Sequence, residues 1–121
     1  MIIQVPISVG ELLDKISILS IKSQHTNNHY VTKELKDLIK IAQEHQVYDA
    51  SYVSQLLSVN RKLWKIEDDL RVLEKSKDFD ATFIDFARSV YITNDQRASI
   101  KKEINEKYKS QYQEIKVHKY F

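Results

Sequence analysis

The chain contains no cysteine, one glycine, Gly10, and one proline, Pro6. Without cysteine it can form neither a disulfide framework nor a thiolate centre, and a reducing compartment suits such a chain. Sheet-rich domains spend many glycines and prolines on turns, so their scarcity here favours a few long helices. A single glycine also excludes a glycine-rich phosphate loop and a Gly-x-Ser-x-Gly nucleophile elbow.

Long apolar runs are also missing. No stretch approaches the roughly 18 apolar residues that span a bilayer, and residues 1–15 lack the basic start and apolar run of a signal peptide. We therefore expect a soluble, cytoplasmic protein without a membrane partner. Lys and Arg number 19 against 17 Asp and Glu, and a net charge of +2 argues neither for nucleic acid nor for a membrane. A nucleic-acid partner is therefore not expected.

The residues that are present predict one helical domain over residues 1–121. The chain is 42% hydrophobic, which is enough for a self-sufficient core at this length. Ser8 and Glu11 form a capping-box pattern, and Asp49 and Asp80 are good N-caps. The apolar periodicity predicts helices over residues 9–25, between 28 and 46, over 50–75, and from 81 to about 109.

A short connection at residues 76–80 joins the two longest expected helices, which predicts an antiparallel hairpin. The expected fold is an all-α antiparallel bundle in which two shorter helices pack on that hairpin. Both ends of the chain are expected to be extended. Residues 112–121 alternate in polarity and predict an extended strap, with pairing to residues 2–5 as one option.

The inner stripe of the third expected helix is unusually polar, because three of its seven seam positions, including Asn60 and Glu67, are not apolar. A buried ion costs several kcal/mol unless it is paired and hydrogen-bonded. The hairpin register sets Glu67 against Tyr91, with Arg88 and Asn94 one turn away. We therefore predict that Glu67 is a seam residue that pairs with Arg88 or Tyr91, buried if the seam is closed and accessible to water if the seam is an open site.

This polar seam has three interpretations. It can be an internal network that fixes helix register, a pocket that binds a small anionic ligand or a partner helix, or an active site for an acidic or phosphorylated metabolite. In the enzyme interpretation Glu67 acts as acid or base, and cations from neighbouring turns hold the anion. The candidate ligand-binding residues are Glu67, Arg71, Arg88, Tyr91, Asn94, Lys101 and Lys15.

No catalytic residue or cofactor follows from the sequence, and no metal site is expected. Asp68 and Asp69 are consecutive and cannot share one helix face. His25 and His29 have a zinc-like spacing, but two asparagines between them break the helix.

A long hairpin covered by two shorter helices leaves apolar side chains uncovered. The third expected helix alone is about 40 Å long. Trp64 lies at the flank of this helix, and Phe83 and Phe86 lie on the fourth expected helix. The sequence therefore predicts a homo-oligomer, of which a two-fold dimer is the simplest form. A structural dimerisation module is the third functional alternative.

Four ordered strings, VPISVGELLDKISIL, LWKIEDDLRVLE, FARSVYITNDQRASIKKEIN and the Tyr-rich tail, resemble an uncharacterised family of small bacterial and phage proteins, a domain of unknown function. The resemblance spans nearly the whole chain and implies no mechanism. A looser likeness in architecture is to helical chorismate mutases, with Lys15, Arg71, Arg88 and Lys101 opposite Glu67. The arginine spacing of that family is absent from residues 9–25.

Overall fold

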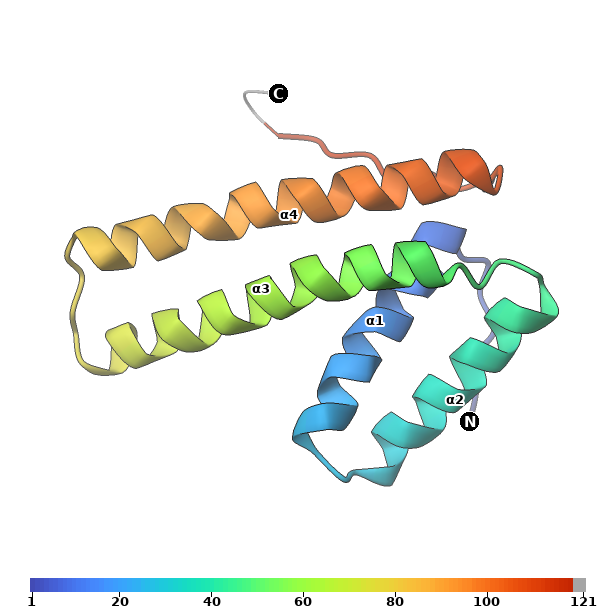
Figure 1. Ribbon diagram of the computed structural model, residues 1–121, viewed down its shortest axis with the longest axis horizontal. Coiled ribbons are helices and arrows are strands. Elements are labelled where there is room, and N and C mark those ends of the chain that lie inside the picture. The colour runs from blue at the N-terminus through green and yellow to red at the C-terminus, as the bar shows by residue number, and fades with distance from the viewer. Residues whose placement is uncertain (119–121) are drawn as a thin grey trace.

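The computed structural model describes residues 1–118, which form four helices (Figure 1): α1 (Val9–His25), α2 (His29–Glu44), α3 (Ala50–Lys75) and α4 (Ala81–Lys107). Residues 1–118 contain no strand, so the all-helical prediction is confirmed. α1 and α3 begin and end at the predicted residues. α4 ends at Lys107, slightly before the expected position.

Each helix begins at a side chain that accepts a hydrogen bond from an otherwise unpaired backbone N–H. Ser8 Oγ accepts from the Glu11 amide at 3.1 Å, as the capping-box pattern predicts. The corresponding N-caps of α2, α3 and α4 are Asn28, Asp49 and Asp80.

The last three helices end without glycine. Gln46, Lys77 and Lys109 follow α2, α3 and α4 in the left-handed region, with φ of 58°, 56° and 53°. In each case the next amide returns to a carbonyl inside the helix at 2.9 Å, as in a Schellman motif. The chain's one glycine, Gly10, lies instead in the first turn of α1.

Gly10 permits close contact between α1 and α4. Its N–H donates to Asn105 Oδ1 at 2.7 Å. A Cβ at position 10 would lie 2.7 Å from the Lys101 carbonyl oxygen and 2.8 Å from Asn105 Oδ1. Only glycine therefore fits this crossing.

The core lies where α1 meets the hairpin. α3 and α4 lie side by side and run in opposite directions, α1 packs across both, and α2 lies against α1 (Figure 1). Leu13, Ile16, Leu56 and Ile104 are fully buried there. α1 and α2 cover only the part of the hairpin that holds the start of α3 and the end of α4, and the rest projects beyond them.

Both ends of the described chain are extended. Residues 1–7 are largely exposed, and residues 110–118 turn back along α4 (Figure 1). The suggested pairing of the tail with residues 2–5 is wrong for the described part, because Glu114 and Lys116 instead contact α4. Residues 119–121 of the expected strap lie outside the described residues. No helix in residues 1–118 combines the length and the hydrophobicity needed to cross a bilayer.

Candidate functional site

Asp14, on α1, is fully buried against α3 and α4, and two side chains donate hydrogen bonds to its carboxylate. Asn60 Nδ2 donates to Asp14 Oδ1 at 2.9 Å and to Ser17 Oγ at 2.8 Å. Arg97 Nε donates to both carboxylate oxygens, at 3.0 and 3.1 Å, and its Nη2 donates to Oδ2 as well. The buried carboxylate therefore holds the guanidinium in one fixed orientation.

Lys101 lies one helical turn after Arg97, and its side chain is only 8% exposed. Its Nζ lies 2.7 Å from Glu11 Oε2, 3.1 Å from Glu114 Oε2 and 3.9 Å from Asp14 Oδ2. Burial lowers the pKa of Lys101, but the hydrogen bonds to Glu11 and Glu114 outweigh it and the net shift is upward. The ammonium therefore stays charged at neutral pH.

The hydrogen bond to Asp14 likewise raises the pKa of Arg97, against the opposing effect of burial. We call Glu11, Asp14, Arg97, Lys101 and Glu114 the charged cluster. Glu11 and Asp14 balance the two cations, so the tail residue Glu114 supplies one carboxylate more than neutrality requires.

The charged cluster lies at a cavity between α4 and the returning tail, which we call the α4–tail groove. Its volume is about 480 Å³. Glu114, Lys116 and His118 line it from the tail. The lining residues of α4 are Val90, Tyr91, Asn94, Asp95, Arg97, Ala98 and Lys101.

A smaller cleft of about 280 Å³ lies where α1 diverges from the hairpin. Asn94 and Arg97 line this cleft as well as the groove. At the end of α1 the His25 ring stacks on Trp64, with centroids 4.6 Å apart and an interplanar angle of 14°. The other lining residues are Ile18, Ile21, Asn60, Leu63, Trp64 and Glu67.

The structure brings together some of the predicted site residues. Tyr91, Asn94 and Lys101 line the α4–tail groove, and Glu67 lines the cleft. Lys15, Arg71 and Arg88 are exposed and line neither cavity.

The predicted pairing of Glu67 with Arg88 or Tyr91 is wrong, and so is the closed form of the seam that would bury it. Its side chain is exposed, and it makes no ion pair or hydrogen bond with Arg88 or Tyr91 within the described chain. The buried position on this turn of α3 belongs to the neighbouring Ile66. The seam follows Leu63, Ile66 and Leu70, so Glu67 lies beside it, at the cleft, and is exposed.

Sequence reasoning missed the centre of the charged cluster. Asp14 and Ser17 are three residues apart and share a face with the buried Ile21, which is the periodic signal that could have identified them. Glu114 had no such signal, because the path of the tail decides its position. Residues 1–118 gather no group of three or more His, Asp or Glu side chains suited to holding a metal ion.

Comparison with known proteins agrees with the sequence resemblance. No curated protein and no solved structure matches this chain. Residues 3–119 match a family described as a family of unknown function, DUF6165. Because this match covers almost the entire sequence, the chain belongs to DUF6165.

Proposed function

We propose that the α4–tail groove binds a small anionic molecule, most simply one that carries a carboxylate. The observation that supports this proposal is the contact between Lys101 and Glu114. A nearly buried ammonium faces the groove and already contacts a carboxylate at 3.1 Å. That carboxylate comes from an extended tail and not from the helical body.

A ligand anion would take the place of the Glu114 carboxylate at Lys101 and would not bind alongside it. Glu114 is the carboxylate that exceeds charge balance in the cluster, so exchanging it for a ligand anion leaves the net charge unchanged. The side chain of Glu114 is 27% exposed, and the next tail contact is the Lys116–Asp95 ion pair at 2.6 Å. Ile115 and Val117 are 75% and 87% exposed, so displacing the tail would cost little apolar burial.

The rest of the groove supplies both polar and apolar contacts. Asp14 fixes Arg97 beside the site of exchange. Asn94 offers an amide, Ala98 leaves room, and Tyr91, which is 52% exposed, offers a ring face for the body of the ligand. Few converging polar groups on an apolar wall are typical of small-molecule sites.

The enzyme alternative receives less support. It requires Glu67 to act beside the cations that hold the substrate, but Arg71 and Arg88 line neither cavity. Lys101 lines the groove, whereas Glu67 lines the cleft. A binding role therefore fits the geometry better than catalysis.

Titration by isothermal calorimetry and NMR tests the proposal, with acetate, succinate, citrate and inorganic phosphate as probes. We expect at least one carboxylate to bind saturably and to shift the resonances of Tyr91, Asn94 and Lys101. Lys101→Met should abolish binding, and the matched control Lys102→Met, at an exposed neighbour, should keep it. Tyr91→Ala, also at an exposed position, should weaken binding without affecting the fold.

Glu114→Gln separates ligand exchange from simple surface binding. The amide is a weaker competitor for Lys101, so carboxylate affinity should rise several-fold. No saturable binding by wild-type protein or by Glu114→Gln would contradict the proposed function, as would binding that survives Lys101→Met.

A further inference from the structure

The end of the hairpin that projects beyond α1 and α2, residues 67–92, has no fully buried side chain. We call it the arm. No residue between Glu67 and Ile92 is buried. The arm nevertheless carries ten large hydrophobic residues: Leu70, Val72, Leu73, Phe79, Phe83, Ile84, Phe86, Val90, Tyr91 and Ile92.

Two helices alone cannot cover these side chains. The seam residues Leu70, Leu73, Phe83, Phe86 and Val90 are only half-buried, because no third helix packs on the arm. A helical core is normally closed by at least one further layer. The arm therefore has the surface of a bundle that lacks its second half.

We infer that the arm of a second copy of this chain covers this surface, with the two arms antiparallel so that four helices form one bundle. A two-fold axis near the middle of the arm makes each contact occur twice. This inference does not depend on ligand binding in the α4–tail groove.

The face that would pair is exposed on α4. Ile84, Ala87 and Tyr91 are spaced by three and four residues and so share one face. Ile84 is 54% exposed and Tyr91 is 52% exposed. The tail lines the α4–tail groove beside Tyr91, so the open part of this face is at Ala87 and Ile84, both exposed within residues 1–118.

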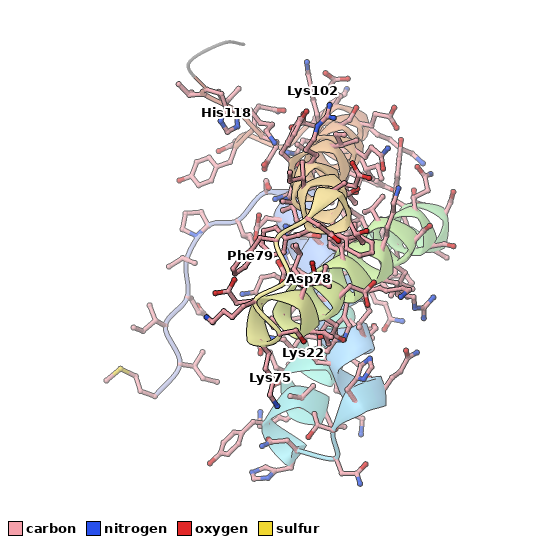
Figure 2. The ribbon with its side chains drawn as sticks, turned by 90° about the vertical axis from the view of Figure 1, so that its left-hand side faces the viewer. Lys22, Lys75, Asp78, Phe79, Lys102 and His118 are labelled. Carbon is pink, nitrogen blue, oxygen red and sulfur yellow. The ribbon has the colours of Figure 1, made fainter. Side chains whose placement is uncertain are left out.

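Charge favours a second copy in this antiparallel orientation. The tip carries exposed carboxylates, and Figure 2, which looks toward the tip, shows Asp78 and Phe79 at the front. Lys22, which follows the cleft residue Ile21 at the base of the arm, is exposed and makes no ion pair within the described residues. Four carboxylates lie near the tip, Glu74, Asp78, Asp80 and Asp85, against two lysines, Lys75 and Lys77, so the tip is net negative. Lys77 pairs with Glu74 at 3.7 Å, which leaves the three aspartates.

The length of the arm brings these charges together. Ile18 and Ile21 of α1 line the cleft with Glu67, so the end of α1 lies at the base of the arm. From Glu67 to Lys75, the last residue of α3, the chain advances about 12 Å at 1.5 Å per residue. When two arms overlap fully and run in opposite directions, the acidic tip of one comes to the level of Lys22 at the base of the other.

Sedimentation equilibrium of the full chain tests this inference. We expect a dimer in the micromolar range that weakens at high salt. Ile84→Glu should be monomeric yet show unchanged helical circular dichroism, because Ile84 is exposed in one copy. Lys36→Glu, an exposed lysine on α2, is the matched charge control and should remain dimeric.

Charge reversal identifies the pairing. Asp78→Lys and Lys22→Glu should each weaken the dimer at least tenfold, and the double variant should recover most of the lost affinity. A monomeric wild type at high micromolar concentration would overturn the inference, and so would a double variant that is weaker than either single one.

The absence of cysteine makes single introduced thiols unambiguous reporters of orientation. Ala87→Cys, near the proposed axis, should form a disulfide-linked dimer on oxidation. Ser76→Cys, at the tip, should not link to itself but should link to Lys22→Cys in a mixture. Efficient self-linking through Ser76→Cys would show parallel arms and contradict the inference.

Discussion

Asp14 explains why this bundle tolerates ions in its interior. Its carboxylate is fully buried, but an amide from α3 and a guanidinium from α4 saturate it. Such a network ties three helices together at one point. Removing one member of a buried pair leaves the other uncompensated, which costs far more than the pair contributes.

Asp14→Ala should therefore lower the free energy of unfolding by about 3 kcal/mol. Arg97 is 28% exposed and can partly turn to water, which keeps the loss near the lower end for buried pairs. Glu67→Ala, at an exposed and unpaired carboxylate, should change stability by less than about 0.5 kcal/mol. Urea denaturation of both variants makes the comparison, and equal losses would contradict the placement of the buried charge.

Gly10→Ala tests the close contact between α1 and α4. Alanine improves helix propensity by about 1 kcal/mol, but its Cβ would lie 2.7 Å from a backbone oxygen that cannot turn away. Overpacking of this kind typically costs about 1–3 kcal/mol, so we expect net destabilisation. Gln24→Ala, exposed on the same helix, is the control and should be nearly neutral. Increased thermal stability of Gly10→Ala would show that the helices can separate without cost.

At the scale of helices, three C-termini are followed by a residue in a strained left-handed backbone conformation. A left-handed conformation costs an ordinary residue roughly 1–2 kcal/mol, and glycine avoids that cost. Three helices nevertheless end with Gln46, Lys77 or Lys109 in this conformation. The hydrogen bonds that close each motif compensate for it.

Gln46→Gly, Lys77→Gly and Lys109→Gly should each stabilise the protein by about 0.5 kcal/mol. The relief of left-handed strain in the folded state should exceed the cost of the extra conformational entropy that glycine gives the unfolded chain. Lys36→Gly, within α2, should instead destabilise by about 1 kcal/mol. Thermal denaturation of the four variants measures these effects. Destabilisation by all four would mean that the left-handed residues are not strained.

The junction of α3 with the end of α4 depends on pH through Asp49. Hydrogen bonds from Lys107 Nζ, at 2.9 Å, and Tyr108 OH, at 2.7 Å, lower the pKa of Asp49 from 3.8 to about 2. A lowered folded-state pKa contributes stability that is complete above pH 4 and is lost as the pH falls toward 2. Stability should therefore decrease across this window.

Asp49→Asn isolates that contribution. The amide oxygen can still cap α3 by accepting from the Tyr52 amide, but it carries no charge for Lys107. The stability difference between wild type and variant should shrink as the pH falls from 4 to 2. Urea denaturation at several pH values gives this difference, and parallel curves would contradict the assignment.

At the scale of the whole molecule, stability is unevenly distributed. Every buried residue lies outside the arm, which has only half-buried and exposed side chains. Regions with few buried contacts open at lower free energy than the core. The two functional proposals centre on different parts of this molecule, the charged cluster at the base and the apolar face on the arm, and they share Tyr91.

Hydrogen exchange should report this difference directly. In dilute protein, amides of residues 68–92 should exchange faster than those of residues 53–66, although both segments are helical. As concentration rises and arms pair, protection should increase selectively in residues 68–92. Uniform protection along α3 at every concentration would show that the arm is stable by itself.

Much of the secondary structure follows from the sequence alone. Periodicity and capping residues such as Ser8 and Asp49 determine the starts of α1 and α3, because both act within a few residues of the chain. The scarcity of glycine and proline pointed to long helices for the same local reason. Exposed apolar side chains on the hairpin were also foreseeable, and Trp64, Phe83 and Phe86 are indeed only half-buried.

Only the tertiary structure decided which polar residues are buried. Seam position alone made Glu67 and Asn60 equivalent, but Asn60 is buried against Asp14 and Ser17 of α1, whereas Glu67 lies at the open cleft. The tail's return to Lys101 likewise depends on long-range ion pairs without a local signature. Burial is a property of what packs against a helix, and the helix's own sequence specifies the face that is available but not how far its partner extends along it.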